Sequence, residues 1–491
     1  MAVHLALVVA SLPITLLLYT VWKLFYNVFL HPLRSFPGPL LARATLLVYN
    51  KHIADGDSHF WVKALHDKYG PVVRIAPDEL VFSEAGAWKD IYGFKKGQVK
   101  DLKFYGTDTV SPHEPGIIRS NDERHAKQRK LFSYAFSDKA LSEQQALIQT
   151  YANLLCEKLS AKAAKNEKVN LCRWFNHTTF DVMADMTFGE SMGLLDGSPN
   201  HEWVDNLFEF LQYIVYMRIA NYWPSITFIF KALMPKNLKQ RLISHQQFTL
   251  ERVNKRLART AEKPDIWSFV DNKFGDKEGA VTQNEITATG ATFMTAGTET
   301  TATELSGLSY LLSQHPDKKQ RLMDEIRTTF SSTEEMTLTK LSQLPYLNAC
   351  IEEGLRYYSP VAVGFPRMVY GDNFQVCDRY VPKRTTISMF QYAVHRSPLS
   401  FHRPDEFLPE RWLPEGQAEF GNDRKDAFNP FSYGPRNCLG KNMAYHEMRI
   451  VLATFMFHFD LELCPESKDW MNQKTYLAWS RPPLMMNLKA R

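Results

Sequence analysis

The segment from Phe431 to Gly440, FSYGPRNCLG, is the feature that most constrains what this chain can fold into. It places Cys438 in a loop rich in glycine and proline, directly before a predicted helix. Gly434 and Gly440 allow close backbone approach, Phe431 can cover the sulfur, and Arg436 offers a cation. A thiolate that ligates haem iron needs such a shielded loop with backbone N–H donors. The alternative is an ordinary buried cysteine, and the spacing favours the ligand.

Composition excludes several other classes of protein. The six cysteines are scattered and form no CxxC pair, which is typical of free thiols in a reducing compartment rather than of a disulfide scaffold or a zinc site. A net charge of +5 over 491 residues is small for this length and does not indicate nucleic-acid binding. We therefore expect no nucleic acid among the partners.

The N-terminus departs from this average composition. Leu5 to Trp22 is an uncharged and mostly apolar run, which as a helix would extend roughly 27 Å, close to the thickness of a bilayer core. A cleaved signal peptide is the alternative, but no Lys or Arg precedes the run and no cleavage-type site follows it. We expect an anchor at residues 1–22 and a proline-rich hinge at residues 23–45. The positive-inside rule places the body in the cytosol, because these basic residues follow the run: Lys23, Arg34, Arg43 and Lys51.

The rest of the chain predicts a mainly α protein with a smaller β region. Val72–Ile75 and Leu80–Phe82 have the pattern of a hairpin, and the stretch from Phe374 to Met389 is rich in strand-forming residues. Long helical patterns run from about Asn284 to Ser313 and from about Tyr346 to Tyr357. Aromatic residues crowd the segment between Phe208 and Phe230, which predicts buried core helices or, alternatively, helices that cover a substrate or dip into a membrane.

The helix predicted from Asn284 to Ser313 has an unusual centre. Thr282 and Glu285 form a capping-box pattern at its start. Its middle is rich in glycine and threonine, which are poor helix formers but let a flat molecule approach the backbone. Glu299 and Thr300 place an acid beside an alcohol in this apolar stretch. A solvated glutamate on an outer face is the alternative for Glu299.

Two further patterns join charged residues. His125 and Arg129 are four apart on one face of a basic helix, which is either a solvated surface or a pair that binds a carboxylate. Glu353 and Arg356 have salt-bridge spacing, and Arg411 can join them. If this set is buried, removal of one member costs on the order of 3–5 kcal/mol.

Together these motifs resemble those of the cytochrome P450 family of haem-thiolate monooxygenases. The similarity covers nearly the whole chain in the form typical of microsomal members, and the segments around His31 and Phe180 are similar to fungal secondary-metabolism hydroxylases of the trichothecene-pathway type. One departure is His125, which stands where the family usually has tryptophan. The matching segments, in chain order, are the oxygen-activating helix motif Ala296–Thr301, the ExxR pair Glu353 and Arg356, the PERF-like Pro409–Trp412, and the haem loop Phe431–Gly440.

The resemblance implies a P450 fold for residues 46–491, with haem as the cofactor and Cys438 as the ligand to its iron. It implies that Glu299 and Thr300 deliver protons during oxygen activation. The implied haem contacts besides Cys438 are His125, Arg129, Arg367, Arg436, Phe431, Gly440 and Ala296. The implied apolar substrate pocket comprises Phe293, Met294, Ala296, Val361 to Phe365, and Leu477 to Trp479.

The implied activity is insertion of one oxygen atom from O2 into a small lipophilic metabolite, as a hydroxylation or an epoxidation. The alternative is a haem-thiolate isomerase, dehydratase or oxidative coupling enzyme that inserts no oxygen. The implied location is the endoplasmic reticulum membrane, crossed once. Electrons are expected from NADPH–cytochrome P450 reductase, with cytochrome b5 as a further donor, at a basic face formed by Lys127, Lys130, Arg436 and Lys441.

Overall fold

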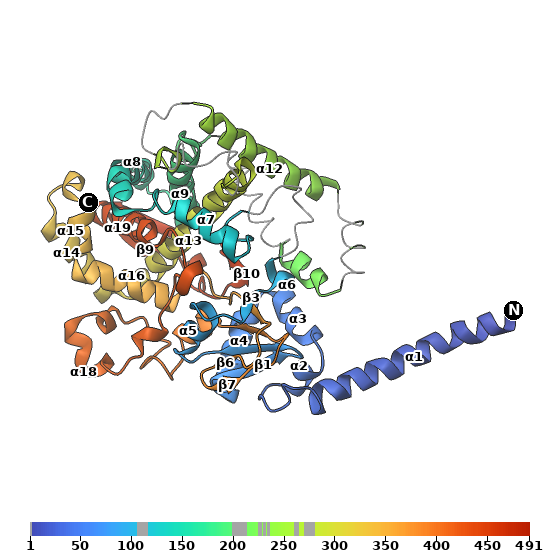
Figure 1. The fold of residues 1–491 in the computed structure, drawn as a ribbon. Coiled ribbons are helices and arrows are strands. Elements are labelled where there is room, and N and C mark those ends of the chain that lie inside the picture. The colour runs from blue at the N-terminus through green and yellow to red at the C-terminus, as the bar shows by residue number, and fades with distance from the viewer. Residues whose placement is uncertain are drawn as a thin grey trace.

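The computed structural model describes residues 2–105, 116–198, 214–223, 228, 232, 236–259, 265–269 and 280–491. Helices make up most of this part of the chain, and the short strands lie beside and between them (Figure 1). The α-helices are α1 (Ala2–Phe29), α2 (Leu40–Ala44), α3 (Leu47–Asp55), α4 (Ser58–Tyr69), α5 (Ala87–Tyr92), α6 (Leu102–Tyr105), α7 (Asp122–Phe132), α8 (Asp138–Ala163), α9 (Leu171–Phe188), α12 (Lys236–Leu257), α13 (Gln283–Gln314), α14 (Pro316–Thr329), α15 (Leu338–Ser342), α16 (Pro345–Tyr357), α17 (Gln391–His395), α18 (Gln417–Phe420) and α19 (Lys441–His458).

The strands form four small sheets. They are β1 (Val72–Ala76), β2 (Glu79–Phe82), β3 (Gln98–Lys100), β4 (Val169–Asn170), β5 (Arg367–Val369), β6 (Gln375–Val376), β7 (Arg379–Tyr380), β8 (Thr386–Ser388), β9 (Phe459–Leu463), β10 (Lys474–Tyr476), β11 (Ala478–Ser480) and β12 (Met485–Ala490). The 3₁₀ turns relevant below are η3 (Pro409–Trp412) and η6 (Gly434–Arg436).

Helix α1 projects away from the rest of the chain (Figure 1). Among the described residues, Ser11–Phe29 within it is the stretch long and apolar enough to cross a membrane. The helix continues to Phe29, beyond the boundary predicted at Trp22, because apolar residues resume after Lys23 and the next proline is Pro32. Helix α2 also occupies part of the predicted hinge, so the non-helical connection is confined to residues 30–39.

The largest sheet has the strand order β1-β2-β8-β5-β3. β1 and β2 form the predicted antiparallel hairpin, in which Val72 lies opposite Phe82. β8 comes from the predicted β-rich region and joins β2 in parallel. β3 and β5 are antiparallel, with Lys100 directly opposite Arg367. Since opposite residues of such a pair project from the same face, two basic side chains far apart in sequence become neighbours.

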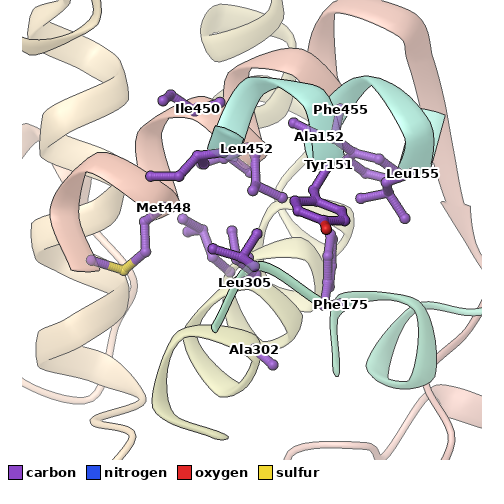
Figure 2. Close-up of a cluster of buried hydrophobic side chains, with 14 of the residues drawn as sticks. Tyr151, Ala152, Leu155, Phe175, Ala302, Leu305, Met448, Ile450, Leu452 and Phe455 are labelled. Atoms are coloured by element: carbon purple, nitrogen blue, oxygen red, sulfur yellow. The ribbon is translucent and has the colours of Figure 1, made fainter. Parts of the chain in front are cut away.

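Helix α13 is the long helix predicted from the Thr-rich segment. Its capping box is present, because the Thr282 hydroxyl accepts from Glu285 N and the Glu285 carboxylate accepts from Thr282 N. Its C-terminal half packs into an apolar core with α8, α9 and α19 (Figure 2). In that core the rings of Phe175 and Phe455 lie 5.6 Å apart between centroids. The core thus fixes α13 while leaving its threonine-rich part free to border a cavity.

Glu353, Arg356 and Arg411 form the predicted buried cluster, and their side chains have 0% relative exposure. Glu353 accepts two hydrogen bonds of 2.8 Å from Arg356 and lies 3.4 Å from Arg411 Nε. Asp423 pairs with Arg411 and supplies a second carboxylate. The charges are therefore compensated inside the protein, where an unpaired one would be strongly destabilising.

This cluster is connected to the cysteine loop. Arg356 donates to the carbonyl of His395 at 2.8 Å, and the His395 ring accepts from Asn429 N at 3.3 Å. Gln391 of the same helix, α17, donates to the carbonyl of Pro430 at 3.3 Å. The base of the loop that carries Cys438 is thereby held by buried polar contacts.

The aromatic-rich segment is described only in part. Residues 214–221 are helical, and Val215 is buried against the hydrophobic cluster around β1. Arg218 donates to the Tyr49 hydroxyl at 2.9 Å. Four aromatic residues of this segment lie outside the described residues: Phe208, Phe210, Tyr213 and Phe230.

Candidate active site

A mostly apolar cavity lies between α7, α13, the start of α19 and the cysteine loop. Its volume is about 330 Å³. Its lining is mostly apolar, and it includes the predicted residues Cys438, Phe431, Gly440, Ala296, Thr300, His125, Arg129, Arg367 and Arg436. One cavity therefore collects every predicted site residue except Glu299.

Cys438 opens onto this cavity from a tightly built loop. Its N–H donates to the Phe431 carbonyl at 2.9 Å. Gly434 has φ +74°, and a methyl group added there would lie 2.1 Å from the Tyr92 carbonyl oxygen, so this turn requires glycine. Gly440, in contrast, has an ordinary φ of −87°. Arg129 donates to the Asn437 carbonyl at 2.6 Å, which fixes the residue before the cysteine.

Burial raises the pKa of the Cys438 thiol, and the Gly440 N–H, Arg129 and Lys441 act in the opposite direction. A thiol in this position is ionised when it coordinates a metal cation, because the metal supplies the missing charge. The surroundings of Cys438 thus fit a sulfur whose anionic form is stabilised by a bound metal cation.

Basic side chains gather along one part of the cavity wall. Arg436 donates to Asp122 at 2.7 Å and to the Ser120 carbonyl at 2.8 Å, yet its Nη1 is buried without a partner among the described residues. Arg367 Nη1 is also buried without a partner among the described residues. Lys100 joins them because β3 pairs with β5.

Burial and neighbouring positive charges lower the pKa of His125 and of Lys100 at this wall. Burial lowers the pKa of His125 to about 3, and the charges of Arg436, Lys100 and Arg129 contribute. Burial likewise lowers the pKa of Lys100 to about 6, assisted by Arg436 and Arg367. An anionic group placed here would relieve this repulsion and satisfy the two free guanidinium nitrogens. The residues therefore fit the two carboxylates of a haem.

Helix α13 forms another wall of the cavity through Ala296, Gly297, Thr300 and Thr301. The Thr300 hydroxyl donates to the Ala296 carbonyl at 2.8 Å, as threonine commonly does inside helices. A methyl group at Gly297 would lie 2.6 Å from Met183 Sδ, so the glycine permits close packing of α9 on α13.

Glu299 is buried but does not line the cavity. Its Oε2 accepts from Arg481 Nη2 at 2.7 Å and its Oε1 from the Thr303 hydroxyl at 3.3 Å. Burial raises the pKa of Glu299 to about 7, and Arg481 and Thr303 oppose this shift. The solvated alternative for Glu299 is wrong, and the role of Glu299 in proton delivery stays a prediction.

The predicted apolar pocket is placed in part. Phe293, Val361 and Phe365 line the cavity, whereas Met294 is buried away from it. The segment Leu477–Trp479 is not among the lining residues either. The Trp479 indole donates to the Ser359 carbonyl at 2.9 Å and stacks on Tyr358, so it belongs to the packing behind the wall.

The cavity also contains residues that the sequence did not indicate: Lys100, Tyr105, Glu304 and Glu447. Lys100 lies in a short strand whose partner is more than 250 positions away, and no local pattern reveals that pairing. Glu304 falls on the α13 periodicity four residues after Thr300, which is the one local signal that could have identified it.

Comparisons with known proteins agree with this geometry. The pattern of the family Cytochrome P450 matches residues 36–489. The chain is 41% identical to cytochrome P450 monooxygenase FUM2 of Gibberella moniliformis, over 95% of this chain and 100% of that protein. It is 39% identical to cytochrome P450 monooxygenase efuB of Hormonema carpetanum, over 99% of both chains. It is 37% identical to cytochrome P450 monooxygenase astJ of Aspergillus oryzae, over 98% and 97%.

These matches confirm the predicted fold class and haem as the cofactor, with a cysteine as the axial ligand of its iron. They favour oxygen insertion over isomerisation, dehydration or coupling, since these relatives are named monooxygenases. The family also implies an electron-donating partner and a lipophilic substrate. The chain therefore belongs to the cytochrome P450 family of haem-thiolate monooxygenases.

Proposed function

We propose that this monooxygenase hydroxylates or epoxidises a small lipophilic metabolite in a fungal secondary-metabolic pathway, with Cys438 as the ligand to the haem iron. Bound haem supplies the activation of O2 and the transfer of one oxygen atom. The observation that carries the proposal is a single apolar cavity. It bears the Cys438 sulfur, the Thr300 hydroxyl and two arginines that each have one buried nitrogen without a partner among the described residues.

Arg367, Arg436, Arg129 and His125 hold the haem carboxylates. The first two contribute buried nitrogens that lack partners among the described residues. Arg129 acts partly through the loop, because it already binds Asn437. Phe431, Gly440 and Ala296 would contact the macrocycle, since they line the same cavity.

Thr300 and Glu299 both take part in proton delivery, but from different positions. Thr300 presents its hydroxyl at the cavity wall and can orient water there. Glu299 lies on the far side of the helix backbone in a buried pair with Arg481, so it serves Thr300 only when its carboxyl turns away from that arginine. The rest of the wall is apolar and excludes water, and it selects the substrate by shape.

The surface next to the cysteine loop suits an acidic electron donor. Lys130 and Lys441 are exposed there. Lys127 is also exposed but pairs with Glu123 at 3.1 Å, and Arg436 is engaged with Asp122, so these two contribute less. NADPH–cytochrome P450 reductase is the proposed donor, and cytochrome b5 a second one. Attraction between such faces chiefly raises the association rate and falls with salt.

The proposed location is the endoplasmic reticulum membrane, with one crossing and a cytosolic body. The supporting feature is α1, whose Ser11–Phe29 stretch can span a bilayer. The proposed organisation comprises an anchor at residues 1–22, a proline-rich hinge at residues 23–45 and a haem domain at residues 46–491. Removal of residues 2–29 should release the protein from membranes with its haem retained, and a truncated protein that stays in the membrane pellet would contradict a single anchor.

Isotopically labelled O2 tests the activity itself. Microsomes that contain the protein and its reductase are incubated with NADPH and a panel of terpenoid and polyketide scaffolds. Incorporation of one labelled atom into a product supports the proposal. Turnover of a substrate without label, or without NADPH, would instead identify a rearranging enzyme.

A further inference from the structure

A second group of polar residues lines the cavity, and the roles assigned above do not use it. Glu304 of α13 and Glu447 of α19 are each 1% exposed, and both face the cavity together with Thr301. Neither carboxyl oxygen of Glu304 has a hydrogen-bond partner among the described residues, and Glu447 Oε1 has none either. Buried carboxyls are ordinarily satisfied, so this recess suits water or another hydrogen-bonding molecule.

Glu304 also reaches a second helix. A methyl group built on Gly354 of α16 would lie 2.0 Å from Glu304 Oε1. The carboxyl therefore sits directly against the α16 backbone, in space that only glycine leaves open. Glu352 is two residues earlier on this helix, at its half-buried edge. Glu304 thus stands between the cavity and α16.

Glu352 continues the path to the surface. Both of its carboxyl oxygens lie 3.0 Å from the Tyr445 hydroxyl, whose one proton they share. Glu352, Tyr445 and Lys441 line an open pocket next to Asn437 and Phe431 of the cysteine loop. Titratable groups therefore lie both at the cavity, where Glu304 is, and at the surface on which the electron donor is proposed to dock, where Glu352 and Tyr445 are.

The electrostatics of this row favour proton-holding groups. Burial raises the pKa of Glu304 well above its usual range, and the charge of Glu352 adds to the shift. Burial raises the pKa of Glu447 to about 8, opposed by a hydrogen bond from Thr301. Burial also raises the pKa of Glu352, which Tyr445, Lys441 and Arg449 oppose. The direction of the shift favours the protonated form of Glu304, the form that can donate.

We propose that Glu304 is a proton relay between the surface pocket at Glu352 and Tyr445 and water in the cavity beside Thr301. In this step the Glu304 carboxyl gives its proton to cavity water. Its carboxylate then takes a proton from Glu352 through an intervening water, because no described residue bonds the Glu304 oxygens directly. Glu352 is reprotonated by solvent in the surface pocket, where Tyr445 holds it in place. One proton enters the cavity, no electron moves, and every group returns to its starting state.

This relay is separate from Glu299, whose carboxylate is paired with Arg481 outside the cavity. It rests on the proposed oxygen-inserting function, because reduction of O2 to one inserted atom and water consumes protons as well as electrons. It adds a consequence that Glu299 does not imply: protons enter from the same face as electrons.

Infrared spectroscopy of the purified holoprotein tests the relay without turnover. The wild-type protein should show a carbonyl-stretch band of a protonated carboxylic acid that persists at neutral pH and shifts in D2O. Glu304→Gln should remove one such band. If the spectrum of the variant is unchanged in this region, Glu304 is ionised and the proposal is overturned.

Turnover separates the relay from a structural role. Glu304→Gln and Tyr445→Phe should each lower product formed per NADPH by about tenfold and increase peroxide release, with the reduced CO spectrum unchanged. Tyr310→Phe is the matched control, because Tyr310 donates to the Lys468 carbonyl and lies away from the cavity. If Glu304→Gln fails to fold, the product formed per NADPH by Tyr445→Phe tests the relay instead. Wild-type coupling in Tyr445→Phe would overturn the route, whereas a wild-type protein that makes no oxygenated product would contradict the proposed function instead.

Discussion

Arg481 Nη2 lies 2.7 Å from Glu299 Oε2, and both side chains are almost fully buried. Arg481 also donates to Asn176 Oδ1 at 3.0 Å, which holds it on the side of α13 away from the cavity. Glu299, the acid of the oxygen-activating motif, is therefore held in an ion pair with a residue from near the chain's C-terminus. Its partner comes from a segment that carries no recognisable motif.

Removal of either member of this pair should destabilise the fold. Arg481→Met leaves a buried carboxyl without its cation, which costs on the order of 3–5 kcal/mol. The double variant Glu299→Gln with Arg481→Met should recover part of this loss, because no unpaired charge remains. Thermal unfolding of the four proteins measures the coupling. Strictly additive effects would mean that the pair contributes no interaction energy.

Gly434→Ala should impair assembly of the cysteine loop. A left-handed conformation costs an L-residue about 1–2 kcal/mol, and the added methyl group meets the Tyr92 carbonyl at 2.1 Å. Haem content per protein should fall. Gly197→Ala is the matched control, since it has φ +82° with nothing within 4 Å. Equal haem content in both variants would show that the clash at Tyr92 is relieved without harm to the loop.

Thr300→Ala should uncouple NADPH consumption from product formation by about tenfold or more, because it removes the hydroxyl at the cavity wall. Thr287→Ala removes an equivalent hydroxyl that bonds the Gln283 carbonyl at 3.0 Å on the exposed part of the helix, and it should remain coupled. Peroxide release and product yield provide the measurement. Normal coupling in Thr300→Ala would mean that other groups deliver the protons.

Glu447 predicts a pH dependence of stability. Its pKa is raised from 4.5 to about 8 in the folded protein. The folded state thus keeps a proton that the unfolded chain releases above pH 4.5. The resulting stabilisation is complete at low pH and is lost as the pH rises towards about 8. Glu447→Gln should gain thermal stability relative to the wild type across this range, and a constant difference would mean that Glu447 does not titrate there.

Local patterns predicted much of the fold. The capping box at Thr282, the hairpin from Val72 to Phe82 and the cluster around Glu353 all follow from residue types at short spacings. Helix α1 continues past Lys23 to Phe29, because a single lysine does not stop an apolar helix.

Long-range pairing explains what the sequence did not reveal. Lys100 meets Arg367 only because β3 and β5 join the same sheet. Arg481 reaches Glu299 only because the chain returns beside α9 and α13 near its end. Glu304 lines the cavity because Gly354 leaves room for its carboxyl. Each of these relationships depends on tertiary packing, and neither spacing nor composition encodes it locally.

The assignment of Cys438 as the iron ligand is tested most directly by the reduced, CO-bound absorption spectrum of Cys438→Ser. The wild-type protein should show the red-shifted Soret band of a thiolate–haem–CO complex. The variant should lose that band completely, because the serine hydroxyl supplies no thiolate. Retention of the band in Cys438→Ser would place the sulfur ligand elsewhere and would contradict the account at its centre.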